Sequence, residues 1–151
     1  MKNTKLIPIM LAAMLTLRLA LAQVAITEIM YAPNQTASET DTEWIELYNT
    51  GPGAVNMTGW KIDNYSFDPA VLTPQQYLVV ARELIDGTDA DTDSFQSVWG
   101  AGINAVDGYF TLSNTGATVI LADEQGNLVD SATYTPSIGA LKNGKTLEKT
   151  D

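Results

Sequence analysis

The sequence contains no cysteine and no histidine, and only 8 of its 151 residues are Lys or Arg. Without cysteine or histidine, the protein cannot form a disulfide, a thiolate, an imidazole general base or a zinc site with the usual ligands. Pairs of Ser with His or Cys with His are excluded for the same reason. Carboxylates, hydroxyls, amides and a few amines remain available for chemistry. The length of the chain suits one domain.

Long apolar runs are also scarce, and the one clear run covers residues 6–17. Two lysines precede it, and Leu19–Ala22 follows with small residues at the positions that signal peptidases require. These features predict a signal peptide over residues 1–22, cleaved before Gln23. Arg18 is unusual between the apolar run and the cleavage site. The alternative is an uncleaved anchor, but twelve apolar residues are too few for a helix that spans a bilayer.

The acidic residues dominate the charge of the chain. Loss of the signal peptide would lower the formal net charge from −10 to −13, because that segment contains three basic residues and no acidic ones. Such a surface repels phosphate backbones and anionic lipid headgroups, so nucleic-acid binding is disfavoured. No second apolar run follows, so no membrane span is expected after cleavage. We expect a protein that is secreted or held in the cell envelope.

The mature chain, residues 23–151, shows the hydrophobic period of two that is typical of β-strands. Ile26 and Ile29 fall on opposite faces of an ideal strand, which predicts a bulge near Glu28. A short helical turn is predicted over Phe95–Trp99, with Asp93 or Ser94 as its cap. Many short strands separated by turns predict an all-β, antiparallel β-sandwich in one domain. The predicted strands cover residues 24–31, 42–49, 55–57, 60–62, 77–81, 109–113, 117–122, 128–134 and 146–148.

Eight sequence blocks occur in a recognisable order: Ile26–Tyr31, Glu43–Asn49, Gly59–Ile62, Leu72–Ala81, Phe95–Gly100, Leu112–Gly116, Val119–Asp123 and Val129–Tyr134. Together they resemble the lamin-tail domain family, and in particular its prokaryotic, secreted branch. The resemblance implies an immunoglobulin-like sandwich that serves as an interaction or anchoring module and has no enzymatic activity. The chain departs from the family pattern at residues 83–93, which are inserted before the helical turn. It also stops where relatives commonly continue.

The inserted loop contains a candidate calcium site formed by Asp86, Asp89, Asp91 and Asp93. Calcium prefers several oxygen ligands, and a cation would relieve the repulsion among four neighbouring carboxylates. The spacing does not fit an EF-hand, because Ser94 stands where that loop requires glycine. The alternative is a solvated acidic loop whose last aspartate caps the helical turn. Calcium is the only cofactor that the sequence suggests.

The predicted strand over residues 42–49 carries two further candidates. Glu43 and Glu46 are three residues apart, so they point to opposite faces and cannot flank one bond as glycosidase carboxylates do. We expect Glu46 to hold a neighbouring strand or turn through a hydrogen bond. Trp44 and Tyr48 share a face and form the candidate binding platform. The alternative for these aromatic residues is packing in the core or at the end of a sheet.

Three functional hypotheses follow from these observations. The leading one is an exported, non-enzymatic interaction or scaffolding module for a protein or a cell-envelope component. Its mark would be an exposed sheet edge or an apolar patch. The first alternative is a calcium-dependent adhesive or glycan-binding module. The second is an accessory domain cut from a larger secreted hydrolase or nuclease. No catalytic residues are predicted.

Overall fold

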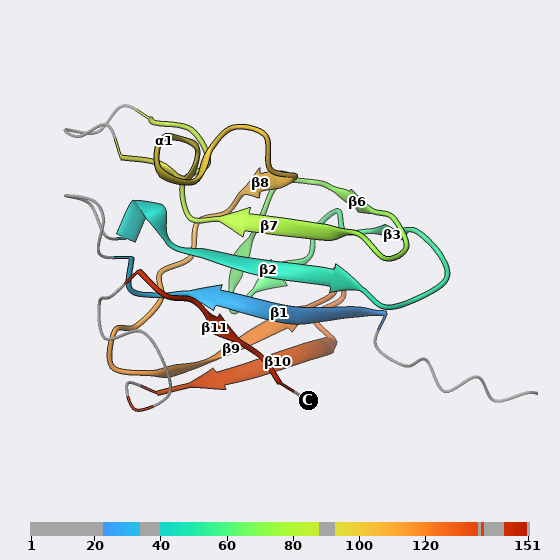
Figure 1. Cartoon of the computed structure of the whole chain (residues 1–151). Helices are drawn as coiled ribbons and strands as arrows, with labels where there is room; N and C mark the ends of the chain where they lie inside the picture. Colours follow the sequence, from blue (N-terminus) through green and yellow to red (C-terminus); the bar gives the residue numbers. More distant parts are fainter. Residues whose placement is uncertain (1–22, 34–39, 88–92, 136, 138–143, 151) are drawn as a thin grey trace, which may run out of the picture.

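The computed structural model describes residues 23–33, 40–87, 93–135, 137 and 144–150. Figure 1 shows two layers of β-strands that pack face to face, with a short helix against one of them. The first sheet has the strand order β11-β1-β2-β7-β8, the second has the order β10-β9-β4-β5, and β3 pairs with β6. The predicted all-β sandwich is therefore confirmed. The predicted signal peptide over residues 1–22 lies outside the described residues.

All strand pairs are antiparallel except β7 and β8, which run parallel. The first sheet contains β1 (Val24–Met30), β2 (Trp44–Asn49), β7 (Tyr77–Ala81), β8 (Ala105–Asp107) and β11 (Leu147–Glu148). The second contains β4 (Lys61–Ile62), β5 (Tyr65–Ser66), β9 (Ala117–Ala122) and β10 (Leu128–Tyr134). The remaining elements are β3 (Val55–Asn56), β6 (Val71–Leu72), the 3-10 helix η1 (Thr40–Thr42) and the helix α1 (Phe95–Trp99).

The hydrophobic core lies between the two larger sheets and follows the alternation of the sequence. Ile45 and Leu47 of β2 point into it and are fully buried. In β1 the register shifts between Ile26 and Glu28, which confirms the predicted bulge. Because the bulge adds one residue, Ile26 and Ile29 both reach the core despite their odd spacing.

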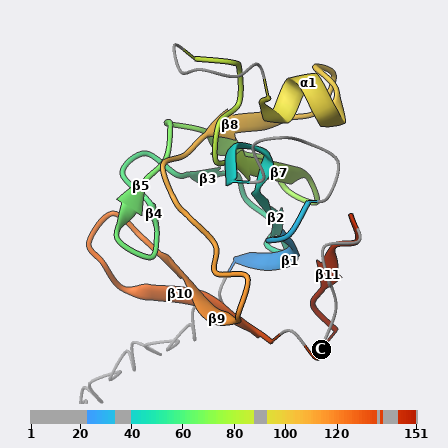
Figure 2. The same ribbon diagram turned by 90° about the vertical axis from the view of Figure 1, so that its left-hand side faces the viewer.

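The helix α1 packs against part of the outer face of the first sheet. In Figures 1 and 2 it lies beside β7 and β8 and far from β9 and β10. The side chain of Ser94 accepts the N–H of Ser97, and the Ser97 hydroxyl accepts the N–H of Ser94. Phe95 is buried against Trp44, and Trp99 packs beside them. The predicted helical turn is confirmed, with Ser94 as its cap.

The strand predicted over residues 109–113 is wrong. Phe110 and Leu112 are buried and Tyr109 is exposed, so the predicted alternation of burial is present. However, the N–H of Leu112 donates to Oε2 of the buried Glu43 at 2.9 Å and not to a neighbouring strand. This segment crosses from β8 in the first sheet to β9 in the second. A crossing segment can alternate in burial without a strand partner.

Gly108 should be intolerant of a side chain, since it sits at the start of this crossing. An added Cβ would lie 2.7 Å from Cγ1 of Val80 and 3.3 Å from Cβ of Phe67. We expect Gly108→Ala to lower the free energy of unfolding of residues 23–151 by about 1–3 kcal/mol in urea denaturation. The control is Gly102→Ala, whose Cβ would meet nothing within 4 Å. Equal stabilities for the two variants would contradict this packing.

Candidate functional site

The second sheet ends at β10, which is the longest edge strand of the two larger sheets. It has seven residues, whereas the edge strands β5 and β11 have two each and β8 has three. A long edge strand presents unpaired N–H and C=O groups, and natural proteins usually shorten, bend or cover such edges. Among the residues that the structure describes, β10 therefore presents the longest strand edge without a neighbouring strand in the two larger sheets.

The first half of β10 is protected against pairing. A register shift between Leu128 and Asp130 marks a second bulge. Asp130 turns toward the first sheet, where its Oδ2 accepts the N–H of Ile26 at 2.8 Å. Bulges and inward-pointing charges are both known ways to disable an edge. From Ser131 onward the pairing with β9 is regular, so the second half of β10 lacks these protections.

Ser131 and Thr133 direct their backbone groups to the open side of β10. The carbonyl of Ser131 accepts a hydrogen bond from Nζ of Lys149 at 3.2 Å, which places this carbonyl away from β9. Ile120 of β9 stands opposite Ser131 and gives the same result. Its N–H and C=O bond to Asp63 on the far side of β9, so they are not available to Ser131. Backbone groups alternate sides along an antiparallel strand, so Thr133 points the same way as Ser131.

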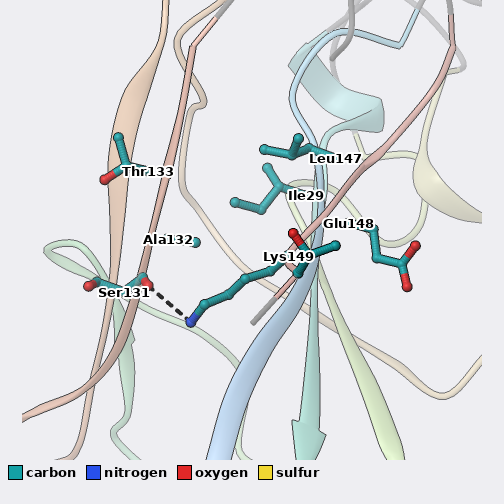
Figure 3. Close-up of a pocket in the computed structure, with 8 residues that line it drawn as sticks. Ile29, Ser131, Ala132, Thr133, Leu147, Glu148 and Lys149 are labelled. Carbon is teal, nitrogen blue, oxygen red and sulfur yellow. Dashed lines mark hydrogen bonds between the residues drawn. The ribbon is translucent and has the colours of Figure 1, made fainter. Parts of the chain in front are cut away.

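A groove of about 280 Å³ runs beside this edge, between β10 on one side and β1 and β11 on the other. The apolar side chains that line it are Ile29, Ala132 and Leu147. Figure 3 shows Ile29 and Leu147 pointing toward β10, while Glu148 points away from the groove. The site thus combines outward-facing backbone groups, of which the Ser131 carbonyl is bonded to Lys149, with an apolar floor. The sequence does not indicate it, because it depends on which strands end the sheets.

Tyr134 fixes the end of β10 next to the groove. It is fully buried, and its ring stacks on Tyr31 with 4.3 Å between the centroids. Burial raises the pKa of Tyr134 to about 12, and its hydroxyl donates to the carbonyl of Ser113 at 2.9 Å. The hydroxyl therefore stays protonated over the physiological range, and it anchors the strand to the turn that precedes β9.

The structure separates the two residues of the predicted aromatic platform. Trp44 is only 9% exposed and packs edge-on against Phe95 and Trp99 of α1, with centroids 6.4 and 6.0 Å away. Trp44 therefore belongs to the packing under α1, and an exposed platform that includes it is wrong. Tyr48 is half-buried and stacks on the exposed Tyr77 at 4.6 Å. The sequence holds one sign of this burial. The predicted helical turn has an apolar side, and that side must pack on an apolar surface such as the ring of Trp44.

Three glutamates lie side by side on neighbouring strands of the first sheet. Glu28 of β1 stands opposite both Glu46 of β2 and Glu148 of β11. Burial raises the pKa of Glu46, the hydrogen bond from Thr27 lowers it, and the charges of Glu28 and Glu148 raise it further. Thr27 Oγ1 donates to Glu46 Oε1 at 2.7 Å, which confirms that Glu46 holds the neighbouring strand β1.

The predicted calcium site falls partly outside the described residues. Asp89 and Asp91 are not among them, while Asp86 is exposed and Asp93 is half-buried just before α1. Within the ranges that the structure describes, no group of three or more acidic side chains is arranged to hold a metal ion. The calcium site and the alternative of a solvated loop both stay predictions.

The layered sheets and their open side define an immunoglobulin-like β-sandwich. A family model described as Lamin Tail Domain matches residues 19–136, which is most of the chain. The protein therefore belongs to the lamin tail domain family, as its sequence blocks predict. The prokaryotic, secreted branch stays a prediction. No curated protein matches the chain. In the described part of the chain, no helix is both long and apolar enough to cross a membrane.

The raised pKa of Glu46 predicts how stability depends on pH. The folded carboxyl holds its proton more tightly than the unfolded group with its ordinary pKa of 4.5, so this residue lowers the free energy of unfolding as the pH rises above 4.5. We expect Glu46→Gln to remove that loss and to be more stable than the parent at pH 7 in urea denaturation. Glu124→Gln, at an exposed turn, is the control. If the free energy of unfolding of Glu46→Gln depends on pH as that of the parent does, the raised pKa does not belong to Glu46.

Proposed function

We propose that this protein is an exported interaction module without enzymatic activity, and that it binds an extended segment of a partner protein or cell-envelope component along β10. Membership of the lamin tail domain family supports the general role, because the immunoglobulin-like fold of this family serves interactions. The observation that carries the proposal is the open edge at Ser131 and Thr133 beside the apolar groove.

An extended peptide is the natural ligand for such an edge. In β-augmentation, an incoming strand receives main-chain hydrogen bonds from the edge, while pockets for alternate side chains give specificity. Ser131 and Thr133 would supply the hydrogen bonds, and the groove over Ile29, Ala132 and Leu147 would receive the side chain between them. The strongly acidic surface argues against nucleic acid as the partner.

The two glutamates of the Glu43–Asn49 segment, Glu43 and Glu46, are consistent with a non-enzymatic role. A carboxylate pair that acts on one substrate bond must converge from two sides of that bond. Glu43 is buried and bonded to the backbone of Leu112, and Glu46 is bonded to Thr27 on the opposite face of the sheet. Both side chains therefore have structural partners, and they do not face a common space.

Export is proposed from the layout of residues 1–22, and it predicts a defined mature end. When the full chain is produced in a bacterial host with an active secretion pathway, we expect the exported product to begin at Gln23 in intact-mass measurement. Ala22→Trp should block cleavage, because the position before the cut requires a small residue. Unprocessed parent protein retained inside the cell would contradict export.

Binding along β10 is tested with proline. We expect random displayed peptides selected on residues 23–151 to bind about tenfold more weakly to Thr133→Pro, because proline removes a donor from the free edge. Thr133→Val is the matched control, since it keeps the N–H and should bind as the parent does.

Thermal melts must show that both variants are folded. Two outcomes would contradict the proposal: failure to select any peptide, or selected peptides that bind Thr133→Pro as well as the parent.

A further inference from the structure

Lys149 occupies a cation site on the β10 edge. Its Nζ lies 2.8 Å from both carboxylate oxygens of Asp130 and 3.2 Å from the carbonyl of Ser131. Figure 3 shows the side chain reaching across the groove from the end of β11 toward Ser131. The edge thus holds an ammonium group with three oxygens, and its present occupant comes from the same chain.

This occupant can be replaced at little cost to the fold. The side chains of Lys149 and Asp130 are 32% and 20% exposed, and ion pairs that water reaches add little to folding stability. The backbone of Lys149 stays on β1, because its N–H donates to the carbonyl of Thr27 at 2.8 Å, so only the side chain has to leave the groove. Lys149 also bonds to the carbonyl of Ser131, which an incoming strand would use. The lysine and the incoming strand therefore compete for one acceptor.

We infer that the partner segment carries a Lys or Arg two residues away from a small apolar residue, and that this cation replaces Lys149 at Asp130. The inference rests on the proposed function, because it names the ligand of the same edge. Asp130 and Ala132 are two residues apart and both face the first sheet. Residues two apart on an added strand also share a face, so one would meet Asp130 and the other the apolar groove.

The acidic surface favours a cationic ligand, but it also attracts cationic peptides non-specifically, so the test needs a control for charge. The formal net charge of −13 of residues 23–151 attracts any cationic peptide, whatever its binding site. A specific effect of Asp130 must therefore exceed the effect of removing an equal charge elsewhere. Glu124 provides this comparison, because it is exposed in the turn between β9 and β10.

The test measures peptide binding by residues 23–151, using calorimetry at physiological salt. The probes are Ser-Thr-Val-Thr-Lys-Thr-Ser and the same peptide with Gln in place of Lys. We expect the Lys peptide to bind tighter than the Gln peptide, and Asp130→Asn to weaken only the Lys peptide, by about fivefold. Glu124→Gln should leave both affinities unchanged. Asn at position 130 can still accept the N–H of Ile26.

Removal of the Lys149 ammonium group, which competes with the peptide, should raise the affinity for the Lys peptide. Lys149→Met keeps the apolar stem and should bind the Lys peptide about twofold to fivefold tighter than the parent. Lys61→Met removes the same charge from β4, beyond β9, and should bind as the parent does.

The possible failures are distinguishable. If the two peptides bind equally and neither responds to Asp130→Asn, the inference is overturned while binding along β10 stands. If neither peptide binds to the parent or to Lys149→Met, and selected peptides bind Thr133→Pro as tightly as the parent, both the inference and the proposed function are overturned.

Discussion

One carboxylate, that of Asp130, joins the two sheets at the open side of the sandwich. It accepts the N–H of Ile26 from the first sheet, and it pairs with Lys149 beyond β11. The bulge in β10 turns Asp130 inward, and the strand then runs regularly to Tyr134. The same carboxylate therefore contacts both β1 and the residue that follows β11. The contact lies at the start of β10, and among the described residues no strand pairs with the side of β10 that faces away from β9.

Much of the fold is readable from the sequence, because the relevant signals are local. The ends of β7, β9, β10 and α1 match the predicted ranges, since alternation of apolar residues and turn or cap residues define them. The bulge in β1 follows from the parity of Ile26 and Ile29 alone. The short strands β5, β6 and β8 have too few residues to show a period, and the sequence does not predict them.

The binding surfaces are less readable, because they depend on contacts between distant segments. Trp44 and Tyr48 share a strand face, as predicted, but only the docking of α1 decides that Trp44 is covered. The row formed by Glu28, Glu46 and Glu148 depends on the register of three strands. The β10 groove likewise requires that β10 and β11 end their sheets on the same side. None of these arrangements leaves a pattern within one segment.

We propose that the backbone groups of β10 that face away from β9 are the centre of function in this member of the lamin tail domain family. The most direct test of this proposal is amide hydrogen exchange along β10, with and without a saturating selected peptide. We expect exchange to slow at Ser131 and Thr133, while Ala132 and Tyr134, whose N–H groups already face β9, change little. Unchanged exchange at Ser131 and Thr133, with protection only near Tyr48 and Tyr77, would contradict it.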